Sequence, residues 1–120
     1  PTLYNPMTSL SPLRIVTYNV KGVLNPIKRA KILGKMKKEK AEVLFLQETH
    51  LSEVEHNKLR RMGFNQVFSS SHKTSRRRGV ATLISRRITF EMIHEYKDKE
   101  DRYNIVVGRL EGQEITFVNV

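Results

Sequence analysis

The stretch Val43-Leu44-Phe45-Leu46-Gln47-Glu48-Thr49-His50 decides how the rest of the chain is arranged. An apolar run leads directly into a polar cluster, and a short unbroken apolar run is typical of a strand buried on both faces of a parallel sheet. Glu48 then lies at the carboxyl end of this strand, where open α/β sheets place their ligands. The stretch therefore predicts a central strand with a functional carboxylate at its end, although a lone Glu that begins a solvated loop is the more common case.

The residues before this stretch predict a strand–helix–strand unit. Residues 14–20 (RIVTYNV) are β-branched and aromatic, which favours a strand. Asn25 and Pro26 provide a helix cap and a first-turn proline, so a helix is expected from there to about Lys40. Its apolar side is expected to consist of Ile27, Ala30, Leu33 and Met36. The connections are too long for a hairpin, so the two strands are expected to be parallel, with a right-handed crossover.

The residues after Thr49 predict a second helix and then an antiparallel meander. Ser52 and Glu55 form a capping box, and the helix is expected to end near Met62. Strands are expected at residues 64–69, 79–85, 88–97, 103–110 and 114–120. The predicted fold class is therefore α/β, a mixed β-sheet with helices on one face. Residues 1–12 are expected to form a flexible amino-terminal arm, and residues 13–120 the folded domain.

Asn19 and Glu48 are the candidate site residues that this arrangement brings together. Parallel neighbours have their carboxyl ends at the same edge of a sheet, so the two side chains should converge. An amide oxygen and a carboxylate would form a hard-oxygen site suited to Mg²⁺ or Mn²⁺. The pattern is equally consistent with an Asn19 that caps its own turn and hydrogen-bonds Glu48 without a metal.

The composition favours a polyanionic partner. The 120 residues include 22 Lys and Arg against 12 Asp and Glu, a formal net charge of +10, which suits nucleic acid better than an acidic membrane surface. Arg76, Arg77 and Arg78 are predicted to contact phosphates from a loop, with a solvated basic loop as the alternative. The absence of cysteine excludes disulfides and thiolate metal sites. No secretory signal or membrane-spanning run is visible.

The four histidines are not expected to take part in the site. The histidines are His50, His56, His72 and His94, and each is predicted to face solvent. His56 is expected to do so from a surface helix.

Four segments in a fixed order carry a resemblance to a known family. They are residues 17–23 (TYNVKGV), 46–50 (LQETH), 78–85 (RGVATLIS) and 115–120 (ITFVNV). Together they resemble the endonuclease/exonuclease/phosphatase superfamily, most closely the endonuclease domains of LINE-type retrotransposons. Those domains are in turn similar to apurinic/apyrimidinic endonucleases and exonuclease III. The resemblance covers residues 13–120 and about the first half of the family domain.

The resemblance implies about half of a two-sheet α/β sandwich and Mg²⁺-dependent hydrolysis of DNA phosphodiesters, with the nucleus as the expected compartment. It makes Glu48 the metal-binding glutamate and Asn19 the active-site asparagine. Lys21 stands where the family usually has Asn, Asp or Arg. It could hold a phosphate as a point charge, or weaken metal binding by repulsion.

The resemblance also implies a limit on activity. In the family, the Asp and His residues that activate water lie in segments beyond those matched here. The chain is therefore expected to be a fragment or truncated copy that is inactive alone, with a non-catalytic, basic nucleic-acid-binding or interaction module as the alternative. Apolar residues in 80–84, 105–110 and 115–120 are expected to lie on a sheet face that the second half would cover, which favours self-association.

Overall fold

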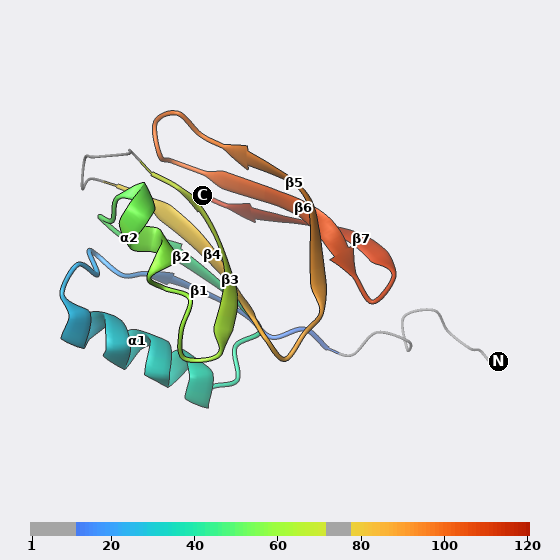
Figure 1. Cartoon of the computed structure of the whole chain (residues 1–120), viewed down its shortest axis with the longest axis horizontal. Helices are drawn as coiled ribbons and strands as arrows, with labels where there is room; N and C mark the ends of the chain where they lie inside the picture. Colours follow the sequence, from blue (N-terminus) through green and yellow to red (C-terminus); the bar gives the residue numbers. More distant parts are fainter. Residues whose placement is uncertain (1–11, 72–77) are drawn as a thin grey trace.

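The computed structural model describes residues 12–71 and 78–120, and its elements form three layers (Figure 1). Helix α1 lies against one face of a four-stranded sheet, and a three-stranded sheet covers the other face. In chain order the elements are β1 (Ile15–Asn19), α1 (Pro26–Lys38), β2 (Val43–Gln47), α2 (Glu53–Asn57), β3 (Phe64–Ser70), β4 (Val80–Ser85), β5 (Phe90–Lys97), β6 (Asn104–Leu110) and β7 (Gln113–Asn119).

The first sheet is mixed, as predicted. Its strand order is β1-β2-β4-β3, in which β1 and β2 are parallel and the other pairs are antiparallel. The predicted strand–helix–strand unit with parallel strands is therefore confirmed. The second sheet has the order β5-β6-β7 and is entirely antiparallel. The fold class, an α/β fold with a mixed sheet and helices on one face, is confirmed.

The apolar run of β2 is buried because both faces of the strand are covered. Leu44 and Leu46 belong to the core on the helix side, together with Leu33 of α1. Val43 belongs to the second core, between the two sheets. Successive side chains of a strand point to opposite faces, so an unbroken apolar run fits only a strand covered on both sides.

Aromatic rings fill much of the space between the two sheets. The ring of Phe117 in β7 has its centroid 6.0 Å from that of Phe45 in β2 and 5.4 Å from that of Phe90 in β5. Gly108 in β6 makes this packing possible, because a Cβ there would lie 2.3 Å from Cζ of Phe90. Ring packing thus helps to attach the second sheet to the first, and it contributes beyond its buried area.

One expectation about exposure was wrong. Residues 80–84 were predicted to lie on an uncovered face, but every residue of β4 (Val80–Ser85) is buried. The strands β5–β7 turn away from the first sheet and cover its second face, instead of extending it as a meander.

The helices also differ in detail from the prediction. Leu33 and Met36 are buried as expected, whereas Ile27 is 69% exposed. Arg29 takes the buried position one turn before Leu33, and its guanidinium donates to the carbonyl of Val23 at 3.3 Å. Residues 29, 33 and 36 share one face of a helix, so the buried stripe is displaced from the predicted one. Helix α2 ends at Asn57, earlier than the predicted Met62.

No helix among the described residues is long and apolar enough to cross a bilayer. The arm predicted for residues 1–12 falls almost entirely outside the described residues, as do Arg76 and Arg77.

Candidate active site

Asn19 and Glu48 meet at the carboxyl edge shared by β1 and β2. Asn19 is the partner of Gln47 in the parallel register, so Glu48 follows directly after the last paired residue of β2. Nδ2 of Asn19 donates to Oε2 of Glu48 at 2.5 Å. The predicted convergence of the two side chains is observed, while their roles in metal binding and catalysis stay predictions.

The backbone at Glu48 turns out of the strand and leaves its side chain exposed. Glu48 has a φ of 51°, in the left-handed region, which costs a residue with a Cβ roughly 1–2 kcal/mol. Its carbonyl accepts from the backbone N–H of Gly22 at 2.6 Å, which joins the turn after β2 to the turn after β1. The turn that carries the exposed carboxylate is therefore joined to the turn after β1.

The amide of Asn19 has a defined orientation. Its Oδ1 accepts from the backbone N–H of Lys21 at 3.0 Å, and a backbone N–H can only donate. Nδ2 must therefore face Glu48, so the hydrogen-bonding network assigns oxygen and nitrogen without ambiguity. In this arrangement Asn19 both caps its own turn and orients the carboxylate.

Lys21 lies two residues beyond Asn19 and is exposed. Its φ of 50° is in the left-handed region, like that of Glu48, and its carbonyl accepts from the ammonium of Lys28 at 3.4 Å. A cationic side chain is thus anchored beside the Asn19–Glu48 pair by its backbone. Its predicted contact with phosphate stays a prediction.

A hollow of about 350 Å³ opens beside Glu48. The turn between β5 and β6 forms one wall and contributes Asp101 and Arg102, and the segment just before β4 contributes Arg78. The guanidinium of Arg78 donates to the carbonyl of Glu100 at 3.2 Å, which fastens it to that turn. Of the three arginines predicted to contact phosphate, Arg78 is the one that the structure describes, and it lines the hollow.

Arg102 is paired within its own turn. Its guanidinium lies 3.2 Å from Oδ2 of Asp98 and 3.1 Å from Oε2 of Glu100. Burial alone would raise the pKa of Asp98, but the backbone N–H groups of Arg102 and Glu100 and the Arg102 guanidinium outweigh it and lower that pKa. Sequence reasoning missed Asp101 and Arg102, because only the packing of the two sheets brings this charged turn to Glu48.

The donor chemistry of the hollow fits a hard divalent cation, but only in part. Glu48 offers a carboxylate at the surface, which Mg²⁺ and Mn²⁺ prefer as a ligand. Within residues 12–71 and 78–120, no group of three or more His, Cys, Asp or Glu side chains could hold a metal ion. Around the hollow, the described residues therefore offer one exposed carboxylate and no complete set of metal ligands.

The prediction that His56 faces solvent was wrong. His56 is fully buried, with Nε2 2.7 Å from Oγ1 of Thr49 and Nδ1 3.1 Å from Oγ of Ser71. Burial lowers its pKa to about 4, and the charge of Lys97 acts in the same direction. The sequence did contain a signal, because residues 56 and 59 share a helical face and Leu59 is apolar.

Over residues 16–120 the sequence matches the family described as the Endonuclease/Exonuclease/phosphatase family. The fold is similar to that of AP endonuclease LMAP from Leishmania major, with a TM-score of 0.64 and 18% identity over 97% of this chain and 43% of that one. An AP endonuclease from Archaeoglobus fulgidus gives a TM-score of 0.58 and 24% identity over 88% of this chain and 40% of that one.

A third solved structure is D. rerio TDP2 complexed with single strand DNA product. It gives a TM-score of 0.61 and 19% identity over 88% of this chain and 44% of that one. At these identities the likeness shows the fold. The chain spans between 40% and 44% of the length of the three structures.

Proposed function

Because the chain belongs to the endonuclease/exonuclease/phosphatase family, we propose that it forms the amino-terminal half of a metal-dependent DNA endonuclease. The observation that carries this proposal is the Glu48 carboxylate, held by Asn19 at the shared carboxyl edge of β1 and β2. We assign it to the retrotransposon or exonuclease III-like type, which the order and spacing of the segments around Asn19 and Glu48 support. With DNA as substrate, its place of action is the nucleus.

The residues around the hollow have distinct roles in this proposal. Glu48 would hold a divalent cation, Mg²⁺ or Mn²⁺, and Asn19 orients the carboxylate that would bind it. Such a cation would supply Lewis-acid polarisation of a phosphate oxygen and stabilisation of the leaving oxygen. Arg78 lines the same hollow and Lys21 is exposed beside it, and both are suited to contact phosphates of the substrate.

We further propose that these 120 residues do not cleave DNA alone at a rate typical of the family. A positioned general base contributes typically 10²–10⁴-fold, and each group that stabilises developing charge about 10²–10³-fold. Among the described residues that line the hollow there is no histidine, and Glu48 and Asp101 are the carboxylates. By resemblance to the family, the general base and the groups that stabilise developing charge belong to the second half of the family domain.

DNA nicking by four versions of the protein tests this proposal. The 120-residue chain is compared with a chain extended through the second half of the family domain, each with Glu48 intact and with Glu48→Ala. We expect nicking of supercoiled DNA in Mg²⁺ only from the extended, Glu48-intact form, and none in EDTA. Glu114→Ala is the matched control, because it removes an exposed carboxylate on β7 that does not line the hollow.

Two other outcomes would overturn parts of the proposal. Strong nicking by the 120-residue chain that Glu48→Ala abolishes would make the half-domain itself a nuclease. DNA binding by the extended chain without any Mg²⁺-dependent nicking would favour the alternative, a basic nucleic-acid-binding or interaction module, which the net charge of +10 supports.

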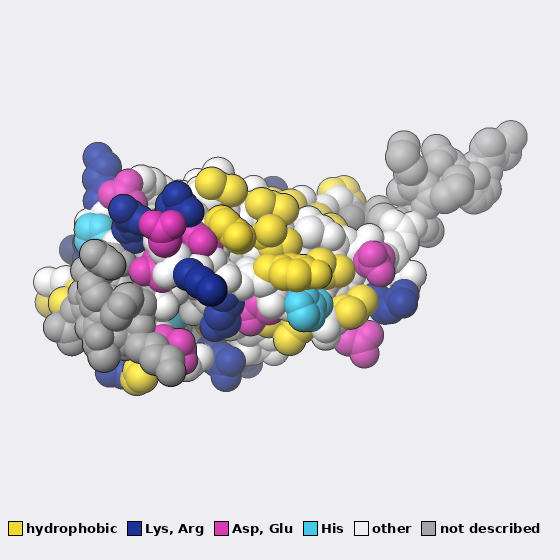
Figure 2. All heavy atoms as spheres, turned by 90° about the horizontal axis from the view of Figure 1, so that it is seen from above, with side chains coloured by type: hydrophobic (Ala, Val, Ile, Leu, Met, Phe, Trp, Pro, Cys, Tyr) yellow, Lys and Arg dark blue, Asp and Glu magenta, His cyan; other side chains and the backbone are white. Residues whose placement is uncertain are grey.

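The outer face of β5–β7 supports a proposal about self-association. Tyr96, Ile105 and Val118 are partners across the three strands, and Tyr96 and Val118 are each 52% exposed. Figure 2 shows apolar side chains gathered on this side of the molecule. A second copy of the chain, related by a two-fold axis, would cover this face, and we propose that the isolated chain pairs in this way.

A further inference from the structure

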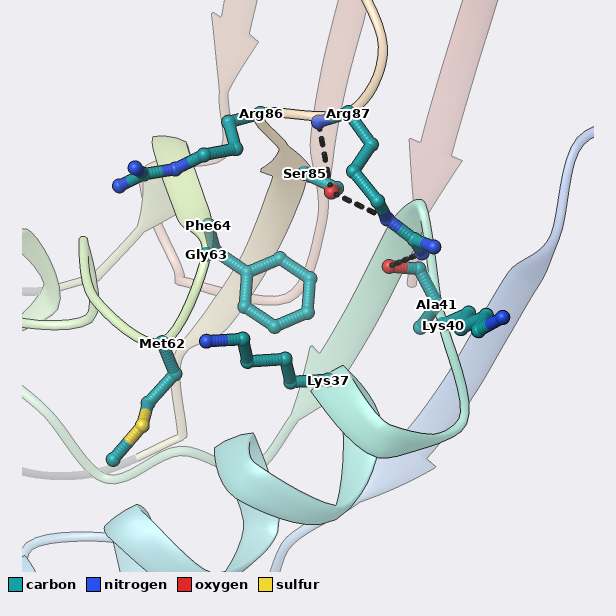
Figure 3. Close-up of a pocket in the computed structure, with 9 residues that line it drawn as sticks. All are labelled: Lys37, Lys40, Ala41, Met62, Gly63, Phe64, Ser85, Arg86 and Arg87. Atoms are coloured by element: carbon teal, nitrogen blue, oxygen red, sulfur yellow. Dashed lines mark hydrogen bonds between the residues drawn. The ribbon is translucent and has the colours of Figure 1, made fainter.

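A second hollow lies at the end of the first sheet remote from Glu48 (Figure 3). It has a volume of about 590 Å³, and its walls come from the end of α1, the start of β3 and the turn between β4 and β5. In the antiparallel register Val43 pairs with Ile84, whereas Gln47 pairs with Val80 beside the candidate active site. The hollow and Glu48 are therefore separated by the length of β2, about 17 Å for five residues.

The hollow is strongly basic. Lys37, Lys40, Arg86 and Arg87 line it, and no acidic residue does. Among the described residues, the ion pairs involve only the cations of Lys97 and Arg102. The cations around this hollow therefore have no carboxylate partner in the part of the chain that the structure describes.

Backbone contacts hold the basic walls in place. The guanidinium of Arg87 donates at 3.5 Å to both the carbonyl of Ala41 and Oγ of Ser85, and its backbone N–H donates to that Oγ at 3.1 Å. The backbone N–H of Arg86 donates to the carbonyl of Gly63 at 2.9 Å. Figure 3 shows the Lys37 side chain running toward Gly63 and Phe64 from the opposite wall. The arrangement is thus partly organised before any ligand arrives.

The dipole of α1 accounts for only two of the four cations that line the hollow. Lysines near the last turn of a helix interact favourably with its dipole, which accounts for Lys37 and for Lys40 just beyond α1. Arg86 and Arg87 belong to the turn after β4 and have no such role. Like charges gathered around one concavity repel one another, and an anion in the hollow would remove that repulsion.

We propose that this hollow binds phosphates of a nucleic-acid backbone, as a second contact separate from the scissile phosphate. Lys and Arg are the residues that most often contact phosphate, and Met62 and Phe64 also line the hollow. Lys40 and Arg86 are exposed, so a nucleic-acid strand can reach them from solvent. This contact extends the footprint of the protein on nucleic acid to the end of the sheet opposite the site of cleavage.

The salt dependence of DNA binding tests the assignment. Binding of a labelled DNA duplex is measured over a series of salt concentrations for the 120-residue chain and for the double variant Lys40→Ala/Arg86→Ala. Neither of these side chains makes a hydrogen bond to another described residue, so folding should be kept, and melting checks this. Each phosphate contact contributes about 0.9 to the slope of log affinity against log salt, so we expect the slope to fall by about two.

The matched control is Lys31→Ala/Lys35→Ala, which removes the same charge from exposed positions of α1 outside the hollow. We expect this control to keep the slope of the wild type. An unchanged slope in the Lys40/Arg86 variant, or an equal fall in both double variants, would overturn the site.

Two further comparisons distinguish this phosphate-binding hollow from the proposed nuclease activity and from binding to lipid phosphates. The salt slope of the Lys40→Ala/Arg86→Ala variant is measured by binding and the role of Glu48 by nicking, so either proposal can fail while the other stands. Sedimentation with vesicles that contain an anionic phospholipid gives the second comparison. Vesicle binding that depends on Lys40 and Arg86 while DNA binding does not would replace the nucleic-acid assignment with a lipid surface.

Discussion

At the residue scale, His56 joins the segments around the candidate site. Thr49, which directly follows Glu48, and Ser71, which directly follows β3, both hydrogen-bond to its ring. Gly79 packs against the same group, since a Cβ there would lie 2.6 Å from Oγ1 of Thr49 and 3.3 Å from Cε1 of His56. Its φ of 97° also favours glycine. The turn that carries Glu48 thus rests on a neutral buried imidazole.

His56 should make stability depend on pH. The unfolded chain takes up a proton there near pH 6.5, whereas burial delays protonation of the folded chain to about pH 4. Unfolding therefore binds a proton in this window, and the free energy of unfolding should fall as pH falls from about 6.5 to 4. The full shift corresponds to about 3 kcal/mol. Lys97 adds to the effect, and Glu55 and the backbone at Ser52 oppose it.

Denaturant unfolding of His56→Gln at several pH values measures this contribution. We expect a flatter dependence on pH between 6.5 and 4 in the variant than in the wild type. His94→Gln is the control, because it replaces a histidine that is exposed on β5 rather than buried. Equal dependence in all three proteins would contradict the assignment.

The sequence was sufficient to predict the positions of residues that depend only on the local strand–helix–strand pattern. Asn19 and Glu48 lie at the carboxyl ends of β1 and β2, which are parallel because a helix connects them. Their proximity therefore follows from local structure. Asp101 and Arg102 reach the same hollow only because one sheet packs on the other, and no local pattern specifies that packing. His56 was misplaced because a polar residue on a short helix is usually solvated, and its burial depends on partners from two other segments.

At the element scale, Asn119 connects β7 to the first sheet beside the candidate site. Its Oδ1 accepts from Nε2 of Gln47 at 2.9 Å. Its Nδ2 donates to the carbonyls of Ala81 at 2.9 Å and Leu46 at 3.2 Å. Gln47 precedes Glu48, so the end of β7 helps to fix the strand end that carries the carboxylate.

Replacing Asn119 should therefore be costly. Asn119→Ala leaves buried polar groups of β2 and β4 without their partner, and we expect a loss of about 2–4 kcal/mol in the free energy of unfolding. Thr116→Ala, at an exposed position of the same strand, should cost less than about 0.5 kcal/mol. Denaturant unfolding measures both. A small loss for Asn119→Ala would show that ring packing alone holds the two sheets together.

Individual strands were easier to predict than their grouping into sheets. The meander was expected to follow from residue 64 onward, and its strands do occur near the predicted positions, with β5 starting at Phe90 and β3 ending at Ser70. The turn at residues 86–89, however, carries the chain to a second sheet. Alternation of apolar residues reports that one face is buried, but it does not report which other strands cover that face.

At the scale of the whole molecule, the chain covers its sheets unequally. The first sheet has α1 on one face and the second sheet on the other. The outer face of the second sheet leaves apolar side chains in solvent, and Val120 beyond β7 is 78% exposed. The prediction of exposed apolar residues thus failed for β4 but holds for Val118 and Val120 at the end of the chain.

The last prediction is that the 120-residue chain self-associates through the outer face of β5–β7. We expect sedimentation to show a concentration-dependent dimer, because burying large apolar side chains contributes up to about 1.5–3 kcal/mol each. Tyr96→Ser/Val118→Ser removes two half-exposed side chains without changing charge, and it should weaken the dimer at least tenfold, which corresponds to about 1.4 kcal/mol. Ile27→Ser/Val54→Ser is the control, since these residues are 69% and 68% exposed on the helices. If both double variants weakened association equally, general hydrophobicity would explain it. If the wild type stayed a monomer with a melting temperature independent of concentration, the sheet face would be stable in water by itself.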